Sequence, residues 1–395
     1  MPLSFDKRWK EVCSGRAPRF LPPFNPWVGK LHFSSYRELC PIQDLLPRHL
    51  PLIRLDANEN ALGPSPLALE AIRSAASETH RYPEIAGEGL RELVAGELGV
   101  DPEQIVFGNG STELLELLFH VFLRSRQDEV VVPRYSFPLY EFLAQRLGCR
   151  VRTAPDRNFT ADLESLIGAI TPRTRLVFLA NPNNPTGTHV DPVALLDFAK
   201  RLPPHVLLAI DEAYADFLDH PPAIVRAMRE GAPIVALRTF SKLYGLASLR
   251  IGYALAPGEI ARAIQKVSLP TNTSGFAQRA AAAALRDRSH QRASKKCVQE
   301  GRLRLERSFR ELGLSWVPST ANFVMVRLPH AEEVWKELVR RGVLVRSLQS
   351  WGLSGWLRVT IGSPEELRQF AGGLQAVLRE DRPERPQPAR TAGAP

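Results

Sequence analysis

Three short apolar segments in the middle of the chain each end abruptly at polar side chains. The segments cover residues 175–180, 206–210 and 233–237, and the polar residues that follow them include Asn184, Asp211 and Lys242. A β-rich apolar run of this length, bounded by turn residues, is typical of a buried strand in a parallel sheet. Because ligands of open α/β sheets bind outside the carboxyl ends of the strands, the three side chains are expected at one edge of a doubly wound sheet.

Lys242 is the most informative of these residues. A lysine at the inner end of a buried strand is rare, because desolvation disfavours its charge. The same desolvation lowers the pKa of the amine and makes it suitable for forming a Schiff base. The alternative for a lone lysine is a side chain that extends its charge to the surface.

An amine of this kind, combined with a buried carboxylate, suits pyridoxal phosphate, an electron-withdrawing cofactor whose ring nitrogen pairs with an aspartate. Asp211 is the candidate for that aspartate, and Asn184 and Tyr214 are candidates for contacts with the ring oxygen. Each has a structural alternative: a helix N-cap for Asp211, a turn residue for Asn184 and a core aromatic for Tyr214. Their order along the chain and their positions after strands favour the cofactor site.

A phosphate site is predicted separately in residues 104–118, which have the pattern of a strand, a glycine turn and an amphipathic helix. Gly108 and Gly110 permit close backbone approach, and Ser111 and Thr112 open the helix. The free N–H groups of a helix N-terminus bind anions. A capped helix without a ligand is the alternative.

Arg250 follows Lys242 closely and is a candidate for a charge-assisted contact to the same phosphate. Thr239 and Ser241 add hydroxyl groups beside the lysine. An arginine on its own is more often a solvated surface residue, so the prediction for Arg250 depends on the neighbouring motif.

Taken together, the motifs resemble those of histidinol-phosphate aminotransferases, a branch of the class I/II, fold-type I aminotransferases that depend on pyridoxal phosphate. The resemblance extends over about residues 50–378 and implies an α/β fold, with a large domain built on a doubly wound, mainly parallel sheet and a smaller α+β domain. The motifs that carry it are Asn58-Glu59-Asn60, Gly63-Pro-Ser-Pro66, Arg81-Tyr-Pro83, Gly108-Asn-Gly110, Asn181-Pro-Asn-Asn-Pro-Thr-Gly187, Asp211-Glu-Ala-Tyr214 and Thr239-Phe-Ser-Lys242 with Leu249-Arg250.

The resemblance implies a role for each cofactor residue. Lys242 binds the cofactor covalently and then moves a proton, Asp211 pairs with the ring nitrogen, and Asn184 and Tyr214 bind the ring oxygen. Tyr82 of one subunit reaches the cofactor phosphate of its neighbour, which implies a homodimer. The residues that hold the phosphate within one subunit are Ser111, Thr112, Thr239, Ser241 and Arg250.

Three further residues match family positions around the substrate. Phe137 corresponds to the aromatic residue that stacks on the cofactor ring, and Arg358 to the arginine that clamps the substrate carboxylate. Arg346 falls where the family contacts the phosphate of the substrate. The bidentate fork of an arginine suits either anion. Ordinary core packing is the alternative for Phe137, and an edge-strand charge is the alternative for Arg346.

Departures from the family pattern concern mainly the substrate end. Ser248 replaces the usual glycine before Leu-Arg, and Trp351 and Trp356 stand where smaller or tyrosine side chains are common. The family's N-terminal aromatic near the substrate phosphate corresponds to either Trp27 or Tyr36. The chemistry is therefore better supported than the choice of substrate.

Composition argues against several other classes of protein. The apolar content of 44% is ordinary for a globular protein, and no apolar stretch is long enough to span a bilayer. The four cysteines lack the spacing of a metal or redox site, so no metal is expected and a reducing cytoplasm fits best. Much of the net charge of +9 comes from residues 286–310, whose helical pattern without interleaved aromatics indicates a solvated helix face rather than a nucleic-acid surface.

A chain of 395 residues is expected to form two domains. The small domain is predicted to combine a segment before the large domain with a segment after it, and the C-terminal tail is too polar to bury a core. The predicted division is an N-terminal extension at 1–50, a small domain from 51–79 and 285–378, a large cofactor-binding domain at 80–284 and a disordered tail at 379–395.

The sequence thus predicts a homodimeric, pyridoxal-phosphate-dependent aminotransferase of amino-acid biosynthesis that uses a donor such as glutamate. Its other substrate is expected to be a phosphorylated or aromatic amine or carbonyl compound, with L-histidinol phosphate as the best match. A decarboxylase of the threonine-phosphate decarboxylase type is the first alternative, because the sequence does not show which substrate bond is held perpendicular to the cofactor ring. A non-enzymatic binding or regulatory module is the second, and neither a membrane nor a nucleic acid is expected as a partner.

Overall fold

The computed structural model describes residues 45–46, 51–218 and 224–380. Nearly all of the predicted N-terminal extension lies outside the described residues, including the two candidate aromatics Trp27 and Tyr36. The chain from residue 381 onward, which makes up most of the predicted tail, also lies outside them.

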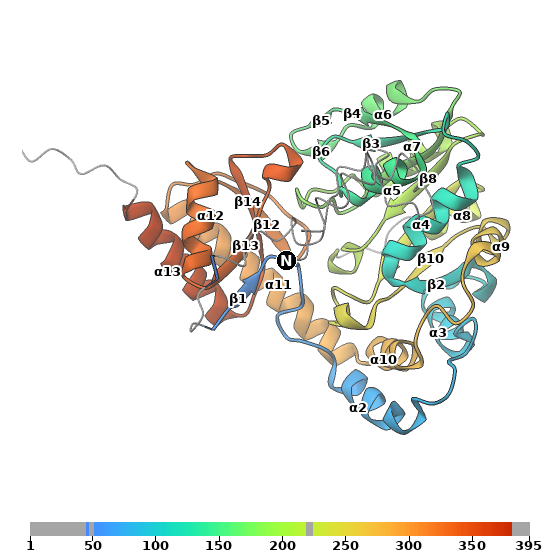
Figure 1. Cartoon of the computed structure of the whole chain (residues 1–395), viewed down its shortest axis with the longest axis horizontal. Helices are drawn as coiled ribbons and strands as arrows, with labels where there is room; N and C mark the ends of the chain where they lie inside the picture. Colours follow the sequence, from blue (N-terminus) through green and yellow to red (C-terminus); the bar gives the residue numbers. More distant parts are fainter. Residues whose placement is uncertain (1–44, 47–50, 219–223, 381–395) are drawn as a thin grey trace, which may run out of the picture.

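A seven-stranded sheet forms the centre of the larger part of the molecule (Figure 1). Its order is β2-β10-β9-β8-β7-β3-β4, and the pairs are parallel except for those that β10 makes with β2 and β9. The three apolar segments of the sequence are the adjacent strands β7, β8 and β9, which confirms the predicted mainly parallel sheet. The strands are β2 (Ile105–Asn109), β3 (Glu129–Pro133), β4 (Arg150–Ala154), β7 (Thr174–Ala180), β8 (Leu207–Asp211), β9 (Ile234–Thr239) and β10 (Ile251–Leu255).

Helices cover both faces of this sheet, because successive residues of each strand point to opposite sides. Leu207 and Ala209 of β8 belong to a core shared with α4, α5 and α9, whereas Leu208 and Ile210 belong to a core shared with α3, α7, α8 and α10. The predicted doubly wound architecture is therefore confirmed. The helices are α3 (Glu88–Leu98), α4 (Gly110–Phe122), α5 (Leu139–Leu147), α6 (Leu163–Ala169), α7 (Pro192–Arg201), α8 (Ile224–Arg229), α9 (Gly258–Val267) and α10 (Gly275–Arg286).

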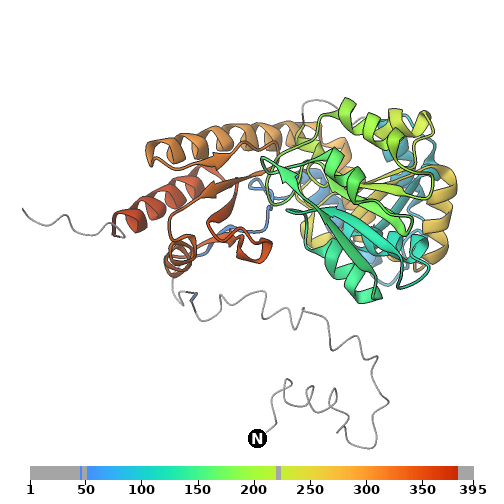
Figure 2. The ribbon, with the colours of Figure 1, turned by 90° about the horizontal axis from the view of Figure 1, so that it is seen from above.

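A five-stranded sheet forms the centre of the smaller part, in the order β1-β13-β14-β12-β11. β1 comes from the segment before the large sheet and pairs in parallel with β13, whereas the other pairs are antiparallel. The long helix α11 runs from α10 to this sheet (Figures 1 and 2), and α2 packs against α10. The elements are β1 (Ile53–Leu55), β11 (Trp316–Val317), β12 (Phe323–Arg327), β13 (Val343–Ser347), β14 (Trp356–Thr360), α2 (Pro66–Ala75), α11 (Arg288–Glu311), α12 (Ala331–Arg340) and α13 (Pro364–Glu380).

A two-stranded hairpin of β5 (Asp156–Arg157) and β6 (Thr160–Ala161) lies outside both sheets. Within the part of the chain that the structure describes, no helix combines the length and the apolar character needed to cross a bilayer.

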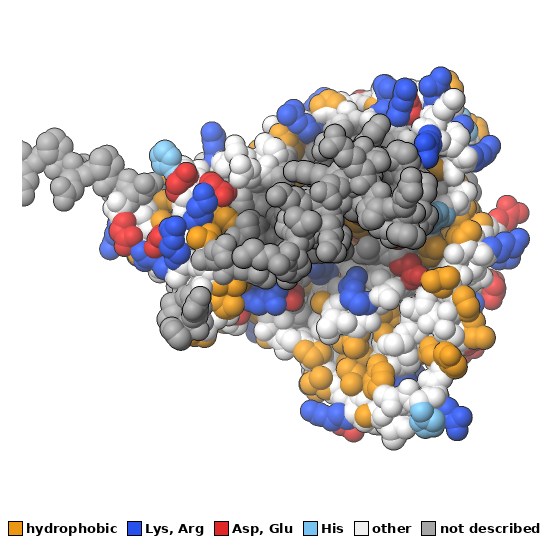
Figure 3. Space-filling view, in the orientation of Figure 1, with side chains coloured by type: hydrophobic (Ala, Val, Ile, Leu, Met, Phe, Trp, Pro, Cys, Tyr) orange, Lys and Arg blue, Asp and Glu red, His pale blue; other side chains and the backbone are white. Residues whose placement is uncertain are grey.

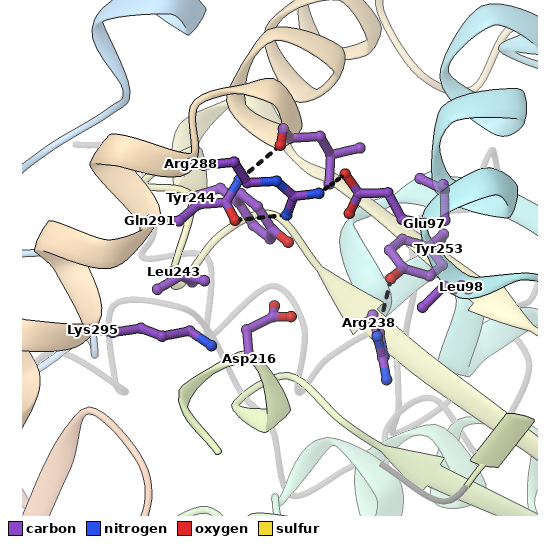
Figure 4. A pocket seen from close by; sticks show the side chains of 12 residues that line it. Glu97, Leu98, Asp216, Arg238, Leu243, Tyr244, Tyr253, Arg288, Gln291 and Lys295 are labelled. Atoms are coloured by element: carbon purple, nitrogen blue, oxygen red, sulfur yellow. Dashed lines mark hydrogen bonds and ion pairs between the residues drawn. The ribbon is translucent and has the colours of Figure 1, made fainter. Parts of the chain in front are cut away.

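A polar cavity of about 160 Å³ lies between α3, β9, β10 and α11, next to the residues that follow Lys242 (Figure 4). Leu243 and Tyr244, the two residues after the lysine, form part of its wall. Arg238 of β9 also lines the cavity, and its Nε atom lies 2.7 Å from Oε2 of the buried Glu212. A buried ion pair of Arg238 and Glu212 therefore lies at the cavity that Leu243 and Tyr244 also line.

Asp216 and Lys295 extend into the same cavity, and Figure 4 shows no hydrogen bond or ion pair from Asp216 to the other side chains drawn. Burial raises the pKa of the Asp216 carboxyl, although the charges of Arg238 and Lys295 oppose this shift. A carboxyl with a raised pKa binds its proton more tightly in the folded than in the unfolded chain. Stability is therefore lost as pH rises from the unfolded pKa through the raised folded pKa.

We expect Asp216→Asn to stabilise the protein above that pH window, because the amide keeps the shape of the side chain and cannot ionise. The melting temperature should rise by about 1–3 °C near pH 8 and the gain should fade toward pH 4. Thermal unfolding followed by circular dichroism across this range measures both effects. Asp197→Asn, which changes an exposed carboxylate of α7, is the matched control. A lower melting temperature for Asp216→Asn near pH 8 would show that attraction to Arg238 and Lys295 outweighs burial.

Candidate active site

The carboxyl ends of β7, β8 and β9 bring three predicted site residues to one edge of the large sheet. Asp211 is the last residue of β8 and pairs in register with Ala180 of β7, and Lys242 follows the end of β9. Asn184 lies in the loop after β7, whose position is fixed because Asn181 donates to and accepts from the backbone of Val190, at 3.1 and 2.7 Å. The predicted convergence on this edge is observed.

The Asp211 carboxylate is buried, and neutral donors satisfy it. Its Oδ2 atom accepts a hydrogen bond of 2.8 Å from the Tyr140 hydroxyl, and its Oδ1 atom accepts one of 3.1 Å from the Ala213 N–H. Burial raises the pKa of Asp211, whereas these hydrogen bonds and the charge of Lys242 lower it. Tyr140, which comes from α5 and is distant in the sequence, is not among the predicted site residues.

The Lys242 amine is half-buried beside Tyr214. Its Nζ atom donates a hydrogen bond of 3.1 Å to the Ala57 carbonyl and lies 5.8 Å from the centre of the Tyr214 ring. Burial, reinforced by the nearby positive charge of Arg358, lowers the pKa of Lys242 to about 8. Gly245 permits this geometry, because it has a φ of +69° and a Cβ atom there would collide with the Gly63 carbonyl.

Asn58 connects Tyr214 to the small sheet. Its Nδ2 atom donates to the Tyr214 hydroxyl at 2.8 Å, its backbone N–H donates to Thr360 Oγ1 at 3.0 Å, and its carbonyl accepts from Asn322 at 3.0 Å. Asn58 is buried and has a φ of +55°, a conformation that asparagine tolerates better than most residues. The sequence placed Asn58 in a family motif but gave it no role.

Arg358 lies on β14 and reaches the Asn184 side chain. Its Nη1 atom donates to Asn184 Oδ1, its Nη2 atom donates to the Asp56 carbonyl at 2.7 Å, and its guanidinium carbon lies 5.2 Å from the centre of the Phe323 ring. Burial lowers the pKa of Arg358 to about 10, and the positive charge of Arg346 contributes to this shift. The two predicted anion-binding arginines are therefore close neighbours.

Arg346 lies on β13, directly opposite Arg358 in the sheet register. Its Nη2 atom lies 3.8 Å from Oδ2 of Asp56, and its side chain keeps 34% of its accessible surface. Arg358 is thus fixed by several contacts, whereas Arg346 retains exposed surface for a ligand. The sequence analysis did not identify Asp56.

The predicted anion site, here called the anion cradle, lies where α4 begins. Ser111 and Thr112 lie in its first turn, after Gly110, and β10 passes so closely that a Cβ atom at Gly252 would lie 2.7 Å from the Ser111 nitrogen. A Cβ atom at Gly110 would collide with the Arg250 guanidinium. The glycines therefore bring backbone N–H groups and a positive charge together, as the sequence predicted for an anion site.

The hydroxyls of Thr239 and Ser241 lie 2.9 Å apart, and Arg250 Nη1 lies 3.4 Å from Ser241 Oγ. Arg250 also donates to the Ala247 carbonyl at 3.0 Å and has a φ of +54°. Ser248, which replaces the family's usual glycine, is exposed and leaves Arg250 turned toward the cradle.

Aromatic side chains surround the loop that carries Phe137. The Phe137 ring meets Tyr140 edge to face at 5.9 Å, and Trp351 Nε1 donates a hydrogen bond of 3.0 Å to the carbonyl of the preceding residue, Ser136. Trp356 packs on Phe159 at 5.0 Å. The two tryptophans that depart from the family pattern therefore contact the large part of the molecule.

Tyr82 is the one predicted cofactor residue that lies apart from this cluster in the single chain. Its side chain is 90% exposed. Tyr82 therefore packs little against the described residues of its own chain, and its action in a neighbouring subunit stays a prediction.

Comparison with known proteins identifies the family. The model of the aminotransferase class I and II family matches residues 51–374. Histidinol-phosphate aminotransferase from Akkermansia muciniphila is 42% identical over 328 residues, which cover 83% of this chain and 90% of that protein. Histidinol-phosphate aminotransferase 2 from Pseudomonas fluorescens Pf0-1 is 40% identical over 367 residues, which cover 91% and 98% of the two chains.

Solved structures give the same result. Histidinol-phosphate aminotransferase from Sinorhizobium meliloti, in complex with pyridoxal-5'-phosphate, superimposes with a TM-score of 0.85 at 30% identity and covers 92% of this chain and 99% of that chain. Aspartate aminotransferase from Thermus thermophilus with maleate has a TM-score of 0.79 at 25% identity and covers 91% and 100%. The predicted resemblance and the fold-type I architecture are confirmed, and the chain belongs to the aminotransferase class I and II family.

Proposed function

We propose that this aminotransferase uses pyridoxal phosphate to move an amino group between a donor such as glutamate and a phosphorylated amine or carbonyl compound, with L-histidinol phosphate as the preferred substrate. The observation that carries this proposal is the convergence of Asp211, Lys242 and the anion cradle at one edge of the sheet. Arg346 and Arg358 of the small sheet add a second anion site next to Lys242. The names of the most similar relatives support the choice of substrate.

The residues at this edge fit the cofactor in charge and shape. Asp211 is a buried carboxylate whose hydrogen-bond donors are neutral, so it can pair with a protonated ring nitrogen. Lys242 has a pKa of about 8, which leaves a usable fraction of its amine deprotonated. The glycines at 110 and 252 leave room for an anion beside Arg250.

Each residue then has a defined task. When bound, the cofactor supplies an electron sink for the substrate carbon. Lys242 would hold the cofactor covalently through Nζ, and the same atom would accept and return the proton at that carbon. Asn184 and Tyr214 orient the ring oxygen, and Phe137 covers one face of the ring. The phosphate is held by Ser111, Thr112, Thr239, Ser241 and Arg250.

Arg358 is proposed to bind the carboxylate of the amino-acid donor, and Arg346 to bind the distal phosphate of the other substrate. Arg358 is rigidly held by Asn184 and the Asp56 carbonyl, which suits a fixed carboxylate clamp. Arg346 is partly exposed and suits a group that enters and leaves. Both belong to the proposed small domain, residues 51–79 and 285–378, and Arg358 contacts Asn184 of the proposed large domain, residues 80–284.

Transfer of the amino group is favoured over decarboxylation of the substrate, because the relatives from Akkermansia muciniphila and Pseudomonas fluorescens are named aminotransferases. A decarboxylase built on the same cofactor site differs in the substrate bond that it holds perpendicular to the ring. Carbon dioxide release measured beside keto-acid-dependent amine transfer separates the two reactions.

The enzyme is proposed to act as a homodimer. Figure 3 shows hydrophobic side chains gathered over the region of α2 and α10, and several large apolar residues of this part of the chain are exposed. A second copy of the chain would bury them. The exposed residues are Leu62, Leu67, Leu69, Tyr82, Ile85, Val267 and Leu269.

Replacement of the lysine tests the chemistry. Lys242→Ala should reduce amine transfer by at least about 10⁴-fold, because both the covalent attachment and the proton carrier are lost. The absorbance of the bound cofactor should also lose the signal of its bond to the protein. Lys296→Ala changes an exposed lysine of α11 and should leave turnover unchanged. Substantial turnover by Lys242→Ala would refute the assignment.

Truncation of Arg346 tests the substrate. Arg346→Ala should raise KM for histidinol phosphate by about 10- to 100-fold, because a charge-assisted contact to the phosphate is lost. KM for histidinol, which lacks the phosphate, should change little. Arg340→Ala, which changes an exposed arginine of α12, is the matched control. An equal loss for both substrates would exclude a phosphate-specific role for Arg346.

Subunit mixing tests whether Tyr82 acts across the dimer. Lys242→Ala and Tyr82→Ala chains should each have low activity, whereas a mixture of the two after dissociation and reassociation should regain about a quarter of the wild-type activity. Half of the dimers are then hybrids, and each hybrid has one site with both intact residues. No recovery in hybrids confirmed by mass would mean that Tyr82 acts within its own chain.

A further inference from the structure

Asp56 is an acidic residue placed among positive charges that are expected to bind anions. Its Oδ2 atom lies 3.8 Å from Nη2 of Arg346, and its Oδ1 atom lies 3.9 Å from Nε of Arg54. The negative charge of Asp56 also favours the protonated form of Arg358. Asp56 is therefore an internal counter-ion for both Arg346 and Arg358.

The Asp56 carboxylate is poorly satisfied by the chain itself. Its side chain keeps only 13% of its accessible surface, and the buried Oδ1 atom accepts no hydrogen bond from the described residues. The contact with Arg346 exceeds hydrogen-bond distance. A buried carboxylate with so few donors costs stability, so its presence beside the substrate requires a reason other than packing.

The backbone of Asp56 places this charge next to the reacting groups. Its carbonyl accepts a hydrogen bond of 2.7 Å from Arg358, and the next carbonyl, that of Ala57, accepts one of 3.1 Å from Lys242. Any charged substrate group that binds Arg346 therefore also interacts electrostatically with the Asp56 carboxylate.

We propose that Asp56 is a specificity-determining residue of the substrate site, which weakens the binding of a substrate in proportion to the negative charge at its distal end. This inference rests on the proposed function, since it takes Arg346 as the distal anion site. An unopposed Arg346, reinforced by the nearby positive charge of Arg358, would bind a phosphate dianion more tightly and release it more slowly after each turnover. The carboxylate cancels part of their charge, so the anion binds and leaves.

The test is the charge dependence of KM in Asp56→Asn, measured near pH 8, where a phosphate monoester carries about two charges. KM should fall about tenfold for histidinol phosphate and about threefold for glutamate, and should stay the same for histidinol, because Coulomb energy scales with ligand charge. Asp56→Ala removes the charge without introducing an amide group that could perturb the loop. Its KM values for the three substrates should change in the same order as those of Asp56→Asn. Glu365→Gln removes an exposed charge of α13 and should change none of the three values.

A higher KM for histidinol phosphate would overturn the proposal, because it would mean that Asp56 only holds Arg346 in place. An equal fall for all three substrates would overturn it as well, since the effect would not follow charge. Both outcomes are distinct from a failure of the proposed function, in which the wild-type enzyme would not use histidinol phosphate at all.

Binding of inorganic phosphate to the holoenzyme provides a readout that does not depend on turnover. The phosphate concentration that raises the melting temperature by a given amount should be several-fold lower for Asp56→Asn than for the wild type. The difference should vanish when Arg346→Ala is combined with either chain. Equal phosphate affinity of wild type and Asp56→Asn would refute the role of Asp56, whatever the natural substrate is.

Discussion

The structure depends on a buried carboxylate, that of Asp211, and a half-buried amine, that of Lys242, at the same end of two adjacent parallel strands. Each group is costly to bury alone, because a low-dielectric interior disfavours its charge. β8 and β9 are completely buried and in register, so they place both groups close together with little freedom. The resulting site lowers the pKa of the amine while keeping a negative charge available beside it.

The second constraint is the connection between the two sheets. Asn58 links Tyr214 at the edge of the large sheet to Thr360 and Asn322 of the small part, and Arg358 reaches from β14 to Asn184. These hydrogen bonds are formed by side chains at the proposed site itself. A change in the relative position of the sheets therefore changes the geometry around Asn184, Tyr214 and Arg358 together.

The sequence predicted the parts of the fold and site that depend on local patterns. The strands that end near Asn184, Asp211 and Lys242, and the helix that follows Gly110, are each marked by contiguous apolar runs and turn residues. The pairing of Tyr140 with Asp211 was not predictable, because it joins residues 71 positions apart and a tyrosine in a helix has an ordinary packing role. Asn58 and Asp56 have partners about 300 positions away in β14 and β13, and no periodicity encodes such contacts.

This difference explains why the chemistry of the chain is better determined than its substrate. The cofactor end is built from consecutive segments of one sheet, whose register leaves little room for variation. The proposed substrate end is assembled from Arg346 and Arg358 of the small sheet, from the segment around Asp56 and from Trp351, which touches the loop of Phe137. Because these side chains line the surface of the site, single substitutions among them can alter its charge and shape while the strands that hold Asp211 and Lys242 stay in place.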